Sequence, residues 1–127
     1  MVGCATQPVP ENSAQEVPQE RNYFHIPGEM ASVSHFVVVR DTGSSGRHEL
    51  LTISIDGRPA ADLQPGEKFF AELPSGRHEF ALSPKSRDQS QALLVHAVDM
   101  NSGRKYSFRA GYSGGEPLFL QNSPATP

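Results

Sequence analysis

The sequence predicts an all-β protein built on a single antiparallel β-sandwich of about seven strands. From Ala31 onward, short runs of β-branched and aromatic residues recur, and Gly, Pro, Asp and Ser residues separate them. No segment combines helical apolar spacing over several turns with capping residues, so we expect little or no helix. Strands with one apolar face bury that face most economically by packing as two layers.

A flexible tether is predicted over residues 1–28. Its prolines are Pro8, Pro10, Pro18 and Pro27, which lie among Gln, Glu, Asn and Ser residues. This composition, with almost no periodic apolar spacing, is typical of an extended, unfolded linker. The short apolar cluster of Tyr23, Phe24 and Ile26 is the exception. We expect it to pack onto the edge of the domain, and contact with a partner is the alternative.

The folded domain is predicted over residues 29–121 and a disordered tail over residues 122–127. The expected strands are Ser32–Arg40, Glu49–Asp56, Arg58–Leu63, Glu67–Leu73, Arg77–Leu82, Gln91–Asp99, Arg104–Tyr112 and Pro117–Gln121. Turn sequences separate several of them: Asp56-Gly57, Gln64-Pro65-Gly66, Pro74-Ser75-Gly76 and Asn101-Ser102-Gly103. We expect an immunoglobulin-like or transthyretin-like arrangement of these strands.

Alternation along the strands predicts which side chains share a face. The four expected sets are Leu51, Ile53 and Ile55; Phe69, Ala71 and Leu73; His78, Phe80 and Leu82; and Tyr106, Phe108 and Ala110. Their mainly apolar character indicates that these faces point into the core.

Two stretches resemble known bacterial surface proteins. Residues 53–82 read ISIDGRPAADLQPGEKFFAELPSGRHEFAL and residues 103–112 read GRKYSFRAGY. Their order of strand, DG turn, PGE turn, apolar strand, PSG turn and later aromatic strand resembles a family of small bacterial lipoproteins of unknown function. It is also similar to the PEGA-type surface repeats. The resemblance implies a non-catalytic role at the cell envelope, and it carries no site residues over because it rests on turn and core positions.

Cys4 is the only cysteine, which excludes an internal disulfide and a thiolate metal cluster within one chain. The opening Met1-Val2-Gly3-Cys4-Ala5-Thr6 resembles the end of a bacterial lipobox. The resemblance implies lipidation at Cys4, an anchor that attaches the protein to a membrane without crossing it. A signal peptide would then have preceded this stretch and been removed. An accidental free thiol is the alternative.

The residue that follows Cys4 bears on the location. In lipoproteins of this kind, an Asp after the cysteine favours retention at the inner membrane, and here the residue is Ala5. The resemblance therefore implies the bacterial outer membrane, on its periplasmic side.

Composition and charge exclude two classes of protein. The formal net charge is −3, from 11 basic and 14 acidic residues without a block of like charge, so nothing in the sequence would attract nucleic acid. No apolar run reaches the roughly 18 residues that a membrane-spanning helix needs.

The histidines His25, His35, His48, His78 and His96 invite a metal or acid-base interpretation. His48 and His78 each follow Gly-Arg and precede Glu, but neither has the second histidine of a helical HExxH zinc site. We interpret both as strand entries after a turn. A cross-strand metal site of His48, His78 and His96 is the alternative. We expect no metal and no cofactor.

Other catalytic patterns are weak. No serine lies in a Gly-x-Ser-x-Gly elbow, and the glycine-rich Gly111–Gly115 lacks the Lys-Ser/Thr of a phosphate loop, so we interpret it as a turn between strands.

The carboxylates are predicted to be scattered among turns and solvent faces: Asp56, Glu67, Glu72, Glu79 and Asp99. The arginines are predicted on solvated outer faces, with a surface for an anionic envelope polymer as the alternative: Arg40, Arg47, Arg58, Arg77, Arg104 and Arg109.

These observations favour a lipid-anchored, non-catalytic interaction module of the cell envelope. Its expected partner is a periplasmic protein or envelope complex, bound through a sheet face or an edge strand. A lipoprotein that binds peptidoglycan or another glycan is the first alternative. A metal-dependent enzyme that uses His48, His78 and His96 is the second.

Overall fold

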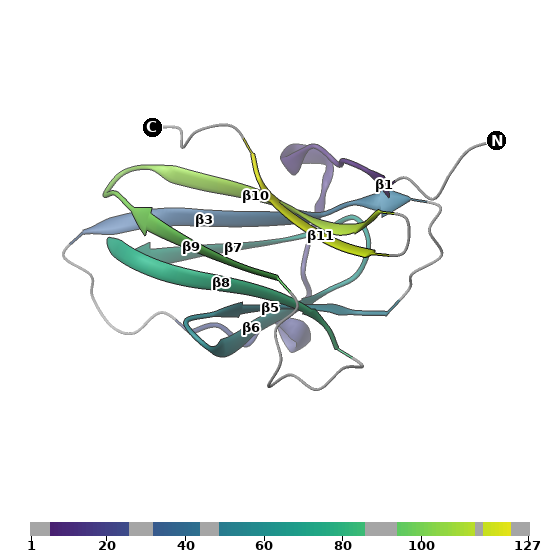
Figure 1. The fold of residues 1–127 in the computed structure, drawn as a ribbon, viewed down its shortest axis with the longest axis horizontal. Coiled ribbons are helices and arrows are strands. Elements are labelled where there is room, and N and C mark those ends of the chain that lie inside the picture. The colour runs from purple at the N-terminus through teal and green to yellow at the C-terminus, as the bar shows by residue number, and fades with distance from the viewer. Residues whose placement is uncertain (1–5, 26–31, 44–48, 86–93, 114–115, 123–127) are drawn as a thin grey trace.

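The computed structural model describes residues 6–25, 32–43, 49–85, 94–113 and 116–122, and confirms the all-β prediction (Figure 1). A five-stranded sheet and a four-stranded sheet pack together, and a small two-stranded sheet adjoins them. Within the described ranges the helical elements are two short 3₁₀ turns, η1 (Glu11–Ser13) and η2 (Gln19–Arg21).

The five-stranded sheet has the order β11-β10-β3-β7-β2. Its strands are β2 (Gln15–Glu16), β3 (Val33–Arg40), β7 (Glu67–Pro74), β10 (Lys105–Ser113) and β11 (Glu116–Gln121). β3 lies at its centre, antiparallel to β7 and parallel to β10, whereas β11 is antiparallel to β10. β2 adds a short parallel pairing at the outer edge of β7.

The four-stranded sheet has the order β6-β5-β8-β9 and is antiparallel throughout. Its strands are β5 (Leu51–Ile55), β6 (Arg58–Leu63), β8 (Gly76–Pro84) and β9 (Leu94–Met100). The two-stranded sheet consists of β1 (Thr6–Gln7) and β4 (Thr42–Gly43). Each strand expected from the sequence therefore has a counterpart, with ends that differ by a few residues.

Backbone geometry confirms two of the predicted turns, the one between β5 and β6 and the one between β6 and β7. Asp56 and Gly57 have φ angles of 51° and 84°, and positive φ at both central residues is the requirement of a type I′ turn between antiparallel strands. Gly66 has a φ of 81°, and the N–H of Glu67 donates to the carbonyl of Gln64 at 3.1 Å. A Pro-Gly pair suits this second turn because its third residue needs a positive φ.

The core lies between the two larger sheets, and its side chains come from the faces that alternation predicts. Phe36 of β3 and Phe80 of β8 stack across the gap with ring centroids 4.2 Å apart, and Phe69 and Phe108 pack edge-on or tilted against Phe36. These four rings are 0–1% exposed. Burial of this apolar area is the main term that holds the sheets together.

The N-terminal segment differs from the predicted flexible tether. Residues 6–25 pair with strands of the domain and pack against it, and Val17 belongs to the hydrophobic core. Composition does not predict that this segment is ordered, because the contacts that order it are made with residues far along the chain. Tyr23 and Phe24 pack against the domain, as expected; Ile26 and the remaining tether residues, 1–5 and 27–28, lie outside the described residues.

Arg40 corrects a second expectation. It is 1% exposed and lies on the inner face of β3, whereas the sequence predicts it on a solvated outer face. Its Nη1 donates to the carbonyls of Glu49 and Leu63 at 2.7 and 2.5 Å, and its guanidinium lies 5.9 Å from the centre of the Tyr112 ring. Burial lowers the pKa of Arg40. Hydrogen bonds and an aromatic face compensate for the loss of water around this charge.

Candidate functional site

Two packed sheets leave two open sides, and the chain itself closes one of them. Residues 15–24, here called the strap, cross from the edge of β7 to the edge of β6. β2 pairs with β7 at the first edge, Asn22 forms a bridge with Ala61, and the N–H of Tyr23 donates to the carbonyl of Ala60 at 2.7 Å. Between these contacts Val17 is buried, so the strap covers this side with both backbone pairing and an apolar contact.

An ion pair fixes the middle of the strap to the start of β7. The Nη1 and Nη2 atoms of Arg21 donate to the two carboxylate oxygens of Glu67 at 2.7 and 2.8 Å. Glu67 also accepts the N–H of Gln64 at 2.8 Å. The hydrogen bond to Glu67 raises the pKa of Arg21. Paired contacts of this fork geometry are stronger and more directional than single ones.

A buried carboxylate fixes the end of the strap. Asp62 of β6 is 1% exposed, and its oxygens accept hydrogen bonds from Tyr23 Oη, Thr52 Oγ1 and Lys85 Nζ at 2.5, 2.7 and 2.8 Å. Burial alone would raise the pKa of Asp62, but the hydrogen bonds outweigh it and hold the pKa below its ordinary value. The same contacts raise the pKa of Lys85 and of Tyr23. This cluster joins the strap, two strands of the four-stranded sheet and Lys85.

The opposite side of the sandwich lies between β9 and β11, which end their respective sheets. Across this gap the Nε2 atom of His96 contacts the carbonyl oxygen of Phe119 at 2.6 Å, and the imidazole meets the Phe119 ring edge-on at 5.1 Å. His96 also lies 5.6 Å from the ring of Phe108. His96 thus connects the two sheets at a point where no strap residue reaches.

β9 presents unpaired backbone groups on this side. In an antiparallel sheet, the backbone hydrogen bonds of successive residues point to alternate sides of the strand. The N–H of Asp56 donates to the carbonyl of Glu79, so the odd-numbered residues of β8 bond toward β5. The even-numbered residues of β8 therefore bond to β9. Their partners on β9 are also even-numbered, which leaves the N–H and C=O groups of Val95, Ala97 and Asp99 pointing away from β8. Among the described residues none pairs with these groups.

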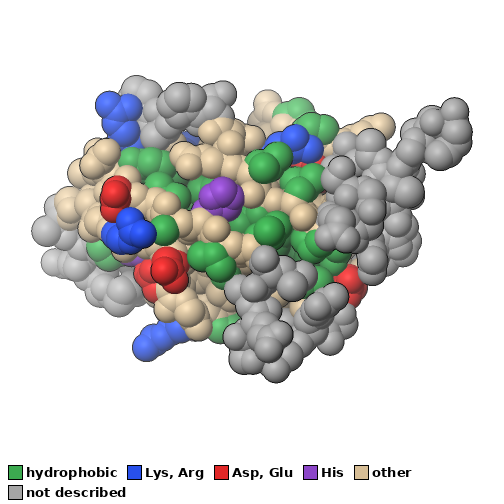
Figure 2. Space-filling model, in the orientation of Figure 1, with side chains coloured by type: hydrophobic (Ala, Val, Ile, Leu, Met, Phe, Trp, Pro, Cys, Tyr) green, Lys and Arg blue, Asp and Glu red, His purple; other side chains and the backbone are tan. Residues whose placement is uncertain are grey.

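The strands on this side, β9 and β11, each carry an exposed apolar side chain. Val95 is 53% exposed and Leu120 of β11 is 49% exposed, values that are high for such residues. Leu94 and Val98 of β9 are half-buried and pack against the core, and Leu118 of β11 is half-buried. In Figure 2, hydrophobic side chains lie in several groups across the face that carries β9 and β11, around one histidine. The β9 edge therefore combines free backbone groups with apolar surface.

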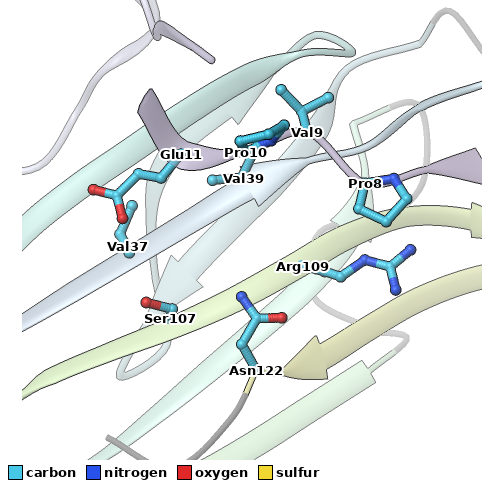
Figure 3. Close-up of a pocket in the computed structure, with 9 residues that line it drawn as sticks. All are labelled: Pro8, Val9, Pro10, Glu11, Val37, Val39, Ser107, Arg109 and Asn122. Atoms are coloured by element: carbon cyan, nitrogen blue, oxygen red, sulfur yellow. The ribbon is translucent and has the colours of Figure 1, made fainter. Parts of the chain in front are cut away.

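A separate groove lies on the outer face of the five-stranded sheet (Figure 3). Its volume is about 280 Å³, with Val37 and Val39 of β3 as its floor and residues 8–11 as one wall. Arg109 forms part of the opposite wall, where its Nη2 donates to Asp41 at 2.6 Å, a bond that raises the pKa of Arg109. The N-terminal segment creates this groove by crossing the outer face of β3.

A larger pocket of about 520 Å³ lies at the end of the sandwich where the β5–β6 hairpin turns. Ile55, Leu73 and Phe24 give it apolar walls, and His78 lines it with both ring nitrogens engaged. Its Nδ1 lies 2.7 Å from Asp56 Oδ2 and its Nε2 lies 2.7 Å from the carbonyl oxygen of Pro74.

The described residues give no support for the alternative of a metal site formed by His48, His78 and His96. His48 lies outside the described residues, while His78 and His96 contact the different partners given above. No group of three or more His, Cys, Asp or Glu side chains suited to a metal ion occurs in the described part of the chain. Cys4, the predicted lipidation site, is outside the described residues.

Several other expectations need correction. Glu67 is buried and paired with Arg21, instead of lying on a turn or solvent face. Gly111 belongs to β10, so the glycine-rich stretch begins inside a strand and not in a turn. A Cβ atom on Gly111 would lie 3.1 Å from the Cβ of Asp41, which explains the glycine by close packing. Arg47, Gly114 and Gly115 lie outside the described residues.

The sequence interpretation missed the residues that build the closed side and the free edge. Val17, Arg21 and Asp62 act through contacts with distant residues, which composition does not reveal. The sequence does contain a signal for the β9 edge. Edge strands are usually protected by charged residues or proline, and the seven residues of β9 contain one charge and no proline.

No helix in the described ranges has the length and hydropathy needed to cross a bilayer. In a comparison with protein-family models, none matches the chain, and a comparison with curated proteins gives no significant similarity.

Proposed function

We propose that this chain is a lipid-anchored, non-catalytic interaction module of the bacterial cell envelope that presents the β9 edge to a periplasmic protein partner. The free backbone groups of Val95, Ala97 and Asp99 carry this proposal. Such groups can bind an extended segment of another protein, which adds a strand to the sheet. The exposed apolar side chain of Val95 supplies contact area beside the new strand.

The finer fold assignment is part of the proposal. β3, β7 and β10 form one layer and β5, β6, β8 and β9 the other, and we assign these seven strands to an immunoglobulin-like or transthyretin-like sandwich. β11 and the short β2 are then additions at the two edges of the first layer. This assignment agrees with the resemblance to PEGA-type repeats, which rests on the same turns and core strands.

The proposed function also includes a lipid anchor at the N-terminus. Lipidation of Cys4 would attach the chain to the periplasmic face of the outer membrane. β1 begins at Thr6, two positions after Cys4, and pairs with β4 of the domain. An anchored module of this kind holds its sheets near the bilayer, so its partner would lie close to the membrane surface. Mass analysis of the N-terminal peptide from a membrane fraction tests the anchor, and an unmodified Cys4 in the soluble fraction would refute it.

Site-specific photo-crosslinking in intact cells tests the binding edge. A photoreactive residue at Val95 should form one main adduct with an envelope protein, and the Ala97→Pro substitution should abolish that adduct because proline removes the free N–H. A photoreactive residue at Ala81 is the matched control, since Ala81 lies opposite Val95 but one strand further from the edge. An adduct at Val95 that persists with Ala97→Pro would contradict strand addition.

Purified peptidoglycan separates the protein partner from the glycan alternative. The proposal expects no retention of the purified protein on sacculi. Retention that the Ala97→Pro substitution leaves unchanged would favour the glycan-binding lipoprotein instead.

A further inference from the structure

We propose that the pocket beside the β5–β6 hairpin binds a small amphiphilic acid, with an apolar body inside the sandwich end and an anionic head at Arg58. This site is independent of the β9 edge and adds a ligand to the proposed function. Its volume of about 520 Å³ falls in the range of small-molecule sites.

The walls of the pocket suit an apolar body. Ile55 and Leu73 are 5% and 2% exposed and come from the two facing sheets. Phe24 lines the pocket from the end of the strap and meets Phe69 edge-on, with centroids 6.0 Å apart. Pro59 and Pro74 add rigid apolar surface at the rim. A flexible hydrocarbon or an aromatic ring would replace water against all of these groups.

The charge at the mouth suits an anionic head. Arg58 pairs with Ile55 across the hairpin, and side chains directly opposite in an antiparallel pair project from the same face. The guanidinium therefore extends on the pocket side of the sheet. Among the described residues it has no ion-pair or side-chain hydrogen-bond partner. A guanidinium in this state can bind a carboxylate through two parallel hydrogen bonds.

Among the described residues that line the pocket, the carboxylate is Asp56, and it is already engaged. Asp56 accepts the backbone N–H of Glu79 at 2.9 Å and contacts His78 at 2.7 Å. Both ring nitrogens of His78 are engaged within the chain, by Asp56 and by the Pro74 carbonyl. His25 also lines the mouth and Tyr23 donates its hydroxyl to Asp62. Of the described residues that line the pocket, Arg58 is therefore the cation without a partner, which favours an acid over an amine as the ligand.

Decanoate, used below its micelle concentration, is the probe for this pocket. Titration into isotopically labelled full-length protein should give saturable amide shifts that centre on Ile55, Leu73 and His78. Decanol, which has the same chain without the charge, should bind at least about tenfold more weakly because it lacks the charge-assisted hydrogen bonds.

Substitutions at two arginines decide the role of Arg58. Arg58→Ala should weaken decanoate about tenfold or more, while Arg58→Lys should retain part of the affinity as a point charge. Arg77→Ala is the matched control, because Arg77 is an exposed arginine of the same sheet whose side chain pairs with Asp99. Its affinity should stay within about twofold of the unchanged protein.

Three results would overturn the proposal: no saturable shifts at millimolar decanoate, shifts centred elsewhere, or equal affinity for the Arg58→Ala protein. Because Arg58 is exposed, its replacement leaves the core intact, and a loss of binding would not reflect unfolding. Each of these results would leave the crosslinking test at Val95 unaffected, so the two proposals fail separately.

Discussion

The two open sides of this sandwich differ in what covers them. Between β6 and β7 the strap supplies a short strand, the buried Val17 and two polar attachments, Arg21 to Glu67 and Tyr23 to Asp62. Between β9 and β11, His96 reaches across to Phe119, while the outward backbone groups of β9 have no partner in the described part of the chain. Within its described residues, the chain therefore covers one edge with its own segment and leaves the backbone groups of the other edge without a partner.

The closed side also indicates what the free side can accept. The strap shows that an extended segment with one apolar side chain and a few directional polar contacts is sufficient to cover such an edge. A partner segment at β9 would use the same physical interactions: backbone pairing with the edge strand and an apolar contact with Val95. If the two sides differ in this way, substitutions on the strapped side should cost more stability than substitutions on the β9 side.

The largest expected effect is at Asp62 on the closed side. Asp62→Ala should lower the free energy of unfolding by about 3 kcal/mol, because it removes a buried acceptor from three donors and releases the end of the strap. Denaturant unfolding measures the change. Asp99→Ala, on the free β9 edge, is the control and should change stability by less than about 0.5 kcal/mol. Equal losses of unfolding free energy at Asp62 and Asp99 would show that the attachment of the strap adds no stability to the closed side.

Acid should weaken the closed side selectively. The folded pKa of Asp62 lies below its unfolded value, so its contribution is present above about pH 4 and is lost as the pH falls through the folded pKa. The stability difference between the unchanged protein and Asp62→Asn should therefore shrink in this acidic range. Urea unfolding at pH 7 and at successively lower pH measures it. A difference that stays constant down to pH 3 would contradict the depressed pKa.

Two valines give the next comparison. Val17→Ala should cost about 1–2 kcal/mol because Val17 is buried under the strap, whereas Val95→Ala should have little effect because Val95 is half-exposed. Denaturant unfolding of the two variants is the measurement. The order should reverse in the crosslinking assay: a photoreactive residue at Val95 should form the adduct, whereas one at Val17 should not. A large stability loss for Val95→Ala would mean that the β9 side is part of the core.

Local sequence patterns predicted the strands well because strand alternation and turn chemistry are short-range properties. Asp56-Gly57 adopts the positive φ angles that its turn requires, and Phe69, Ala71 and Leu73 share the buried face. Arg40 was misplaced although a local signal existed. It is two residues from Val38 and four from Phe36, so alternation puts it on the same inner face as these core residues.

The strap was missed for a different reason. Its proline-rich, polar composition is typical of an unfolded linker, and its ordering depends on contacts with distant residues. Arg21 and Glu67 are 46 residues apart, and Tyr23 and Asp62 are 39 apart. Composition carries no information about such pairings, because a polar residue that will be paired and one that will be solvated are the same in sequence.

The smallest expected effect concerns His96, the contact that spans the side with the free edge. His96→Leu removes its hydrogen bond to the Phe119 carbonyl but keeps an apolar side chain against Phe108 and Phe119, so the loss should be about 1 kcal/mol. Denaturant unfolding measures the loss, and hydrogen exchange at β11 amides should accelerate more than at β7 amides, which the strap covers. Equal acceleration at both sheets' edges would show that His96 supports the whole sandwich, and that the β9 side is held as firmly as the strapped side.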